Sequence, residues 1–297
     1  MNQPTTTSLR RALRREVPST VGLLADAHDF TAMRRYATFP FDDHPAYLRQ
    51  VEGLLKALAT QGGHTTVALF DPEEYAQYCE DTGIDPNRPA SRSRYTAELA
   101  ADGARVTYTG QPMTALVPTL VDTAVRRATW EYATTLLTDT GDCAACGQDI
   151  GRAAFAHASR LLMRLLEAAG PGTHHLVCSV PAADEQLLAA LHATCDDDRP
   201  IELDSDETAE FVTVLAAGIA LESPGGVVLR TTNPGARDRL HGWRLTHGSL
   251  IPLTEAEVFS AYCTDARTGE PLSPEPHVDY RAGFDLTPEA DDWPTHP

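Results

Sequence analysis

The chain has 297 residues, of which 42% are hydrophobic, and this combination is typical of a globular protein and excludes an intrinsically disordered one. Its formal net charge of −18 argues against a nucleic-acid-binding protein, because such proteins need a cationic face that displaces counterions from phosphate. No apolar run approaches the roughly 18 residues of a membrane-spanning helix, so we expect no membrane span.

The N-terminal segment indicates the compartment that we expect. Basic residues occur among the first 20 residues, but no apolar stretch follows them, so the pattern of a secretory signal is missing. We therefore expect a cytoplasmic protein, in which the six cysteines need not form disulfides.

The first half of the chain alternates predicted strands with predicted helices. Apolar runs predict strands at 20–26, 65–70 and 105–108. Asp43 or His44 caps the first strong helix, whose apolar residues recur at helical spacing until Gly62 ends it. Further helices are expected at 73–81, 94–101 and 114–137.

The second half follows a polar break at 138–149 and contains both kinds of element. Helices are expected at 150–169, 184–193, 207–221 and 255–264. Strands are expected at 175–180, 201–203, 226–231 and 243–251. Thr254 and Glu257 have the spacing of a capping box for the last helix.

Strands that alternate with helices indicate βαβ crossovers and therefore an α/β fold. We predict a mostly parallel sheet with flanking helices, in a Rossmann-like, three-layer arrangement, with the possibility of a second, smaller α/β or α+β unit. The expected parts are an N-terminal arm (1–16), an α/β unit (17–140), a second α/β unit or a continuation of the same sheet (141–267), and an acidic, proline-rich tail (268–297). Neither a glycine-rich phosphate loop nor a GxSxG motif is present, which disfavours ordinary nucleotide binding and a standard α/β-hydrolase.

Acidic residues and a histidine follow the first two predicted strands. Asp26 ends the first strand, His28 and Asp29 follow it, and Asp71 follows the second strand. In an open α/β sheet, ligands bind beyond the carboxyl ends of the strands, so these side chains converge if the two strands are neighbours. Asp26, His28 and Asp29 are then candidate catalytic or metal-binding residues, because they supply an imidazole beside carboxylates. The alternative is that the aspartates only cap the turns and helices that follow.

The connection at 27–43 is longer than a usual βα loop, and long loops often carry binding residues. Its Arg34 and Arg35 are candidates, together with Asp71, for binding a small anionic molecule. Tyr36, Phe39 and Phe41 either form the wall of such a pocket or anchor the loop to the core.

The polar break contains Cys143 and Cys146, spaced as a C-x-x-C pair that can chelate one metal ion. His175 and Cys178 repeat this spacing and could complete a zinc site. Two other interpretations are a reversible disulfide, since a thiol near a helix N-terminus has a lowered pKa, and a pair of inert thiols.

These observations lead to three functional hypotheses. The first is an intracellular regulatory or accessory protein that binds a small anionic molecule or a protein partner in the α/β crevice. The second is a hydrolase or transferase that uses the Asp/His site after the first strand. The third is an interaction protein that is stabilised by zinc or switched by the Cys143/Cys146 thiols.

Overall fold

The computed structural model describes residues 19–183, 185–196, 199–265 and 268–286. The chain consists of two compact units, unit 1 (Met1–Arg127) and unit 2 (Ala128–Pro297). The division falls inside the long helix α6 (Met113–Asp139), whose first part packs in the core of unit 1 and whose second part packs in the core of unit 2. Each unit is described separately below.

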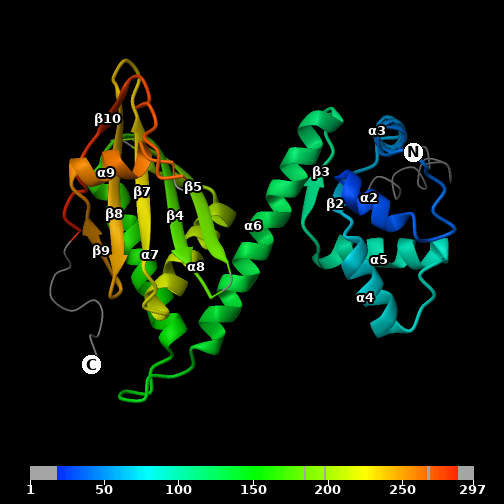
Figure 1. The fold of residues 1–297 in the computed structure, drawn as a ribbon, viewed down its shortest axis with the longest axis horizontal. Helices are drawn as coiled ribbons and strands as arrows, with labels where there is room; N and C mark the ends of the chain where they lie inside the picture. Colours follow the sequence, from blue (N-terminus) through cyan, green and yellow to red (C-terminus); the bar gives the residue numbers. More distant parts are fainter. Residues whose placement is uncertain (1–18, 184, 197–198, 266–267, 287–297) are drawn as a thin grey trace, which may run out of the picture. The chain divides into compact units, whose positions relative to one another are not determined.

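Unit 1 contains a three-stranded sheet in the order β1-β2-β3, of which β2 and β3 are labelled in Figure 1. Its strands are β1 (Ser19–Leu23), β2 (Thr65–Leu69) and β3 (Arg105–Thr107). β1 and β2 are parallel, with Leu23 beside Leu69, and β3 runs antiparallel to β2. The first two strands are thus neighbours that end at the same edge of the sheet.

Four helices and the start of α6 surround this sheet. They are α2 (Ala27–Met33), α3 (His44–Thr60), α4 (Pro72–Thr82) and α5 (Pro89–Asp102). Aspartates cap three of them: Asp26, Asp43 and Asp71 each accept backbone N–H groups in the first turn. The apolar faces of these helices form the core of unit 1 around Leu23 and Leu55, both fully buried.

Unit 2 contains a larger, mainly antiparallel sheet in the order β10-β8-β7-β4-β5-β6, with β9 beside β8 (Figure 1). Its strands are β4 (Gly172–Pro181), β5 (Gln186–Asp196), β6 (Arg199–Leu203), β7 (Gly225–Thr232), β8 (Asp238–Thr246), β9 (Ser249–Pro252) and β10 (Val278–Tyr280). The central strand β4 pairs with β5 on one side and with β7 on the other.

Helices α7 (Ile150–Ala169) and α8 (Ser205–Ala220) pack together on one face of this sheet, and α9 (Glu255–Tyr262) lies on the other (Figure 1). Gly218 lets α8 approach the sheet closely, since a Cβ there would lie 2.7 Å from Leu245 Cδ2 and 2.8 Å from Val180 Cγ2. The face opposite α7 and α8 is left partly open at β4 and β5, where alternate residues are exposed or half-buried.

The prediction of a mostly parallel, Rossmann-like, three-layer fold is wrong. Among the described residues, the strand pairs β1–β2 and β10–β8 are parallel and the other six pairs are antiparallel. Part of the error is the segment 184–193, whose leucines and alanines predicted a crossover helix. In the structure, residues 186–193 of this segment belong to β5, where Leu187, Ala189 and Leu191 point into the core with the two-residue period of a strand.

Other elements follow the prediction more closely. The helices predicted at 150–169 and 207–221 are confirmed as α7 and α8. The connection expected at 27–43 begins instead with α2, and the strand expected at 243–251 is the hairpin β8–β9, which turns at His247 and Gly248 in left-handed backbone conformations.

No helix in the part of the chain that the structure describes has the length and apolar character needed to span a membrane.

Candidate functional site

Asp26, His28 and Asp29 come together at the end of β1. A potential metal-ligand atom of each residue lies within 4.8 Å of those of the other two, and no other such group of three or more His, Cys, Asp and Glu residues occurs among the described residues. Asp71 follows the neighbouring parallel strand β2, and its charge acts on Asp29. The sheet edge therefore carries three carboxylates and one imidazole from two adjacent strand ends.

The local geometry follows from helix capping. Asp26 Oδ1 accepts the backbone N–H of Asp29 at 2.8 Å, which starts α2 and places His28 and Asp29 in its first turn. His28 Nδ1 then lies 3.5 Å from Asp29 Oδ1. His28 is 86% exposed and Asp29 23%, so the cluster opens to solvent through the imidazole.

Like charges make the cluster electrostatically unfavourable as it stands. Partial burial raises the pKa of Asp29, and the neighbouring charges of Asp26 and Asp71 raise it further, although the hydrogen bond with His28 acts in the opposite direction. A bound cation would neutralise this repulsion, and carboxylate and imidazole groups are suitable ligands for divalent metals.

Asp71 is also a helix cap. Its Oδ1 accepts the backbone N–H groups of Glu73 at 2.7 Å and Glu74 at 3.0 Å. The capping alternative for Asp26 and Asp71 is thus correct, but it does not remove these groups from the site, because a carboxylate has two oxygens and each cap uses Oδ1.

Arg34 and Arg35, predicted to bind an anion, follow α2 at its C-terminal end. Arg34 is exposed, whereas Arg35 donates to the carbonyl of Pro72 at 3.2 Å and lies 5.2 Å from the centre of the Tyr36 ring. Arg35 therefore joins the end of α2 to the start of α4. Phe39 and Phe41 pack, partly buried, against the core of unit 1.

Cys143 and Cys146 lie in a compact loop that precedes α7. Cys143 N–H donates to Gln148 O at 2.8 Å and Gly147 N–H to Cys143 O at 2.7 Å, with Gly147 at a φ of 70°. The backbone N–H groups of Cys146 and Ala145, together with the Cys146 thiol, point at the Cys143 sulfur and lower the pKa of Cys143. The loop thus favours a thiolate at Cys143.

The four predicted zinc ligands do not form one group in the described part of the chain. His175 and Cys178 lie on β4 at a separation of three residues, so their side chains point to opposite faces of the sheet. Cys178 is fully buried, and burial raises its pKa to about 12. Cys143 and Cys146 remain a two-thiol pair without His175 or Cys178.

His175 instead stacks on His192 of β5, with ring centres 4.6 Å apart. Burial lowers the pKa of His175, and the charge of His192 lowers it further. The sequence did not indicate His192 and its partner Glu207 as candidate residues. Because 184–193 was predicted as a helix, no cross-strand pairing of His192 with His175 was expected. Recognising the strand period of that segment would have placed His192 on the exposed face.

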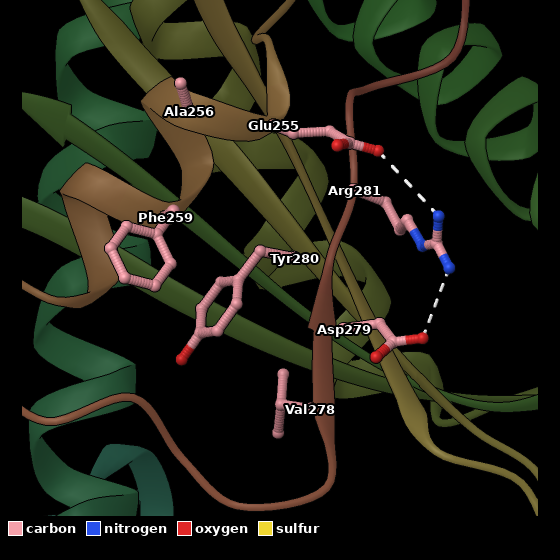
Figure 2. A pocket seen from close by; sticks show the side chains of 7 residues that line it. All are labelled: Glu255, Ala256, Phe259, Val278, Asp279, Tyr280 and Arg281. Carbon is pink, nitrogen blue, oxygen red and sulfur yellow. Dashed lines mark hydrogen bonds and ion pairs between the residues drawn. The ribbon is translucent and has the colours of Figure 1, made fainter.

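A broad, open hollow of about 390 Å³ lies between α9 and β10 in unit 2. Figure 2 shows the rings of Phe259 and Tyr280 on one side of the β10 ribbon and the Arg281 guanidinium on the other. Arg281 forms ion pairs with Glu255 at 3.8 Å and with Asp279 at 3.2 Å. Asp279 also pairs with Arg237 at 2.8 Å, so each of the three charged side chains that line the hollow has an ion-pair partner.

Comparison with known proteins gives one match. A family model described as "Domain of unknown function (DUF8829)" matches residues 8–111, which lie within unit 1 and include Asp26, His28, Asp29 and Asp71. No curated protein and no solved structure matches the chain significantly. These comparisons assign no activity.

Proposed function

We propose that unit 1 is a binding module in which Asp26, His28 and Asp29 hold a divalent cation, and that the chain is an accessory protein that binds a small anionic molecule through this cation. The observation that carries the proposal is the approach of the three ligand groups to within 4.8 Å at the edge of the sheet.

Electrostatics supports a cation as the first occupant of the site. The carboxylates of Asp26, Asp29 and Asp71 repel an anion, so an anionic molecule needs a bridging positive charge. Three protein ligands leave coordination positions open on a divalent ion, and the exposure of His28 gives a ligand access to them. Unlike Arg35, which is bound to Pro72, the metal would present its charge directly at the site.

Mn²⁺ binding measured by electron paramagnetic resonance tests this proposal. We expect one Mn²⁺ per chain in the wild type and an affinity weaker by about tenfold or more in Asp26→Asn and Asp29→Asn. Asparagine also caps helices well, so Asp26→Asn removes the charge and keeps α2. Asp42→Asn is the matched control, because Asp42 is exposed and lies outside the cluster.

The proposal fails if the wild type does not bind Mn²⁺ at millimolar concentration. It also fails if the two cluster variants bind as tightly as Asp42→Asn does.

A hydrolase or transferase is the second candidate, and the pairing of His28 Nδ1 with Asp29 Oδ1 at 3.5 Å favours it. Such a pair can transfer a proton when a substrate lies within hydrogen-bonding reach. Hydrolysis of phosphate or carboxylate esters that is lost in His28→Gln, but kept in His64→Gln, would distinguish this function from binding alone. His64 is an exposed histidine outside the cluster.

A further inference from the structure

A second group of side chains with metal-binding chemistry lies on the open face of the sheet in unit 2. His175 on β4 and His192 on β5 are directly opposite each other, and their rings stack at 4.6 Å with an angle of 23° between their planes. The backbone N–H of His192 donates to Glu207 and therefore points away from β4. The two histidines thus form a non-hydrogen-bonded pair, in which cross-strand side chains come closest.

Glu207 fixes the orientation of the His192 ring. Its Oε2 lies 3.1 Å from His192 Nδ1 and accepts the His192 backbone N–H at 2.8 Å. Glu207 is held in turn by the first turn of α8, where its own N–H donates to the N-cap Asp204 at 2.9 Å. A neutral imidazole that donates from Nδ1 to a carboxylate has an unprotonated Nε2, which is the usual state of a histidine that binds metal.

His175 completes the pair with ring nitrogens that hydrogen-bond to none of the described residues. The nearest cation across the strands is Arg230, directly opposite His175 on β7. Its guanidinium donates to Asp238 at 2.7 Å and to Glu275 at 2.9 Å, which neutralises its charge beside the imidazoles.

We propose that His175 and His192 form a two-imidazole site for a divalent transition-metal ion, with Glu207 as a positioning residue that orients His192. Imidazole nitrogens favour zinc, copper and nickel over the hard cations that carboxylates bind. Two protein ligands leave coordination positions open to water or to an anionic group on the exposed sheet face. This site is separate from the carboxylate cluster of unit 1 and does not depend on it.

Zinc titration by isothermal calorimetry tests the site in the full chain. The background is the Cys143→Ser/Cys146→Ser/Asp26→Asn variant, which removes the C-x-x-C thiols and weakens the Asp26–His28–Asp29 cluster, the other two candidate metal sites in the described part of the chain. We expect this background to bind one Zn²⁺, and His175→Gln or His192→Gln to weaken binding by about tenfold or more. Glu207→Gln should weaken it less, because glutamine still offers an oxygen to Nδ1, and His64→Gln should change nothing.

Far-UV circular dichroism checks that each variant is folded, and histidine ring signals in NMR give a second readout that needs no substitution. Zinc should shift the signals of His175 and His192 before those of the other histidines. The proposal is overturned if the background binds no zinc at about 100 µM, a concentration that would occupy half or more of any site with a Kd of about that value or tighter. It is also overturned if either histidine variant binds zinc as the background does.

Discussion

At the residue scale, one side chain serves two purposes in this protein. Asp26 caps α2 through Oδ1 and, by doing so, brings Asp29 and His28 into the same helical turn. The cluster therefore forms within four consecutive positions and could be predicted from the chain. The contribution of Asp71 depended on the parallel pairing of β1 with β2, which the structure supplies.

The Cys143 thiol gives a prediction at the same scale. The N–H groups of Cys146 and Ala145 lower its pKa, whereas burial raises the pKa of Cys195. More Cys143 is therefore thiolate at neutral pH, and we expect iodoacetamide to alkylate it faster than Cys195 at pH 7. Timed alkylation followed by peptide mass spectrometry measures both rates.

Raising the pH should reduce the difference between the alkylation rates of Cys143 and Cys195, because Cys195 ionises at higher pH than Cys143 does. Equal alkylation rates for the two cysteines at pH 7 would show that the N–H groups of the loop do not lower the pKa of Cys143.

At the scale of single elements, the neighbours of an element decide what its sequence becomes. The segment around 187–191 has the composition of a helix, yet it forms part of β5 because it pairs with β4 along its whole length and buries every second side chain. Helix α7, in contrast, forms as predicted, since its buried residues recur at helical spacing and Asp149 caps it by accepting the Arg152 N–H. Sequence patterns thus predicted a helix correctly where a capping residue and the helical spacing of apolar residues occurred together.

Substituting alanine for two helical glycines distinguishes the effect of close packing on stability from the effect of helix propensity. Gly218→Ala in α8 should destabilise unit 2 by about 1–3 kcal/mol, because its Cβ would meet the buried side chains of Leu245 and Val180. Gly53→Ala in α3 should stabilise unit 1 by up to about 1 kcal/mol, since nothing lies within 4 Å of its Cβ and alanine favours the helix. Thermal unfolding of the two variants measures both effects. An increase in Tm for Gly218→Ala would show that α8 is not packed as described.

At the scale of the whole molecule, each of the two units has its own main core among the described residues. Leu55 and Leu116 belong to the core of unit 1, and Leu162 and Trp243 belong to that of unit 2. The larger sheet brings His175 and His192 together from two adjacent antiparallel strands, while Glu207 comes from the helix after β6. The group of His175, His192 and Glu207 therefore forms only where β4, β5 and the start of α8 come together.

Separate cores predict separate unfolding transitions. All three tryptophans, Trp130, Trp243 and Trp293, fall in the range of unit 2, and the buried Trp243 makes fluorescence a probe of that unit. Leu55→Ala should destabilise unit 1 by about 2–5 kcal/mol, seen as an earlier transition in far-UV circular dichroism, and leave the fluorescence midpoint unchanged. Leu162→Ala is the matched control and should shift the fluorescence transition. A common shift in both signals for Leu55→Ala would show that the units unfold together.

The sequence by itself determined the features that depend on residues close together in the chain. These are the helices α3 and α7 and the proximity of Asp26, His28 and Asp29 within four consecutive positions, whereas the helix α2 that holds this cluster was expected to be part of a connection. Only the tertiary structure decided strand direction, the conversion of a predicted helix into β5, and the pairing of His175 with His192. The physical reason is that capping and periodicity act over one or two turns, whereas strand pairing joins residues that are distant in sequence, and its outcome depends on which partner buries the apolar face.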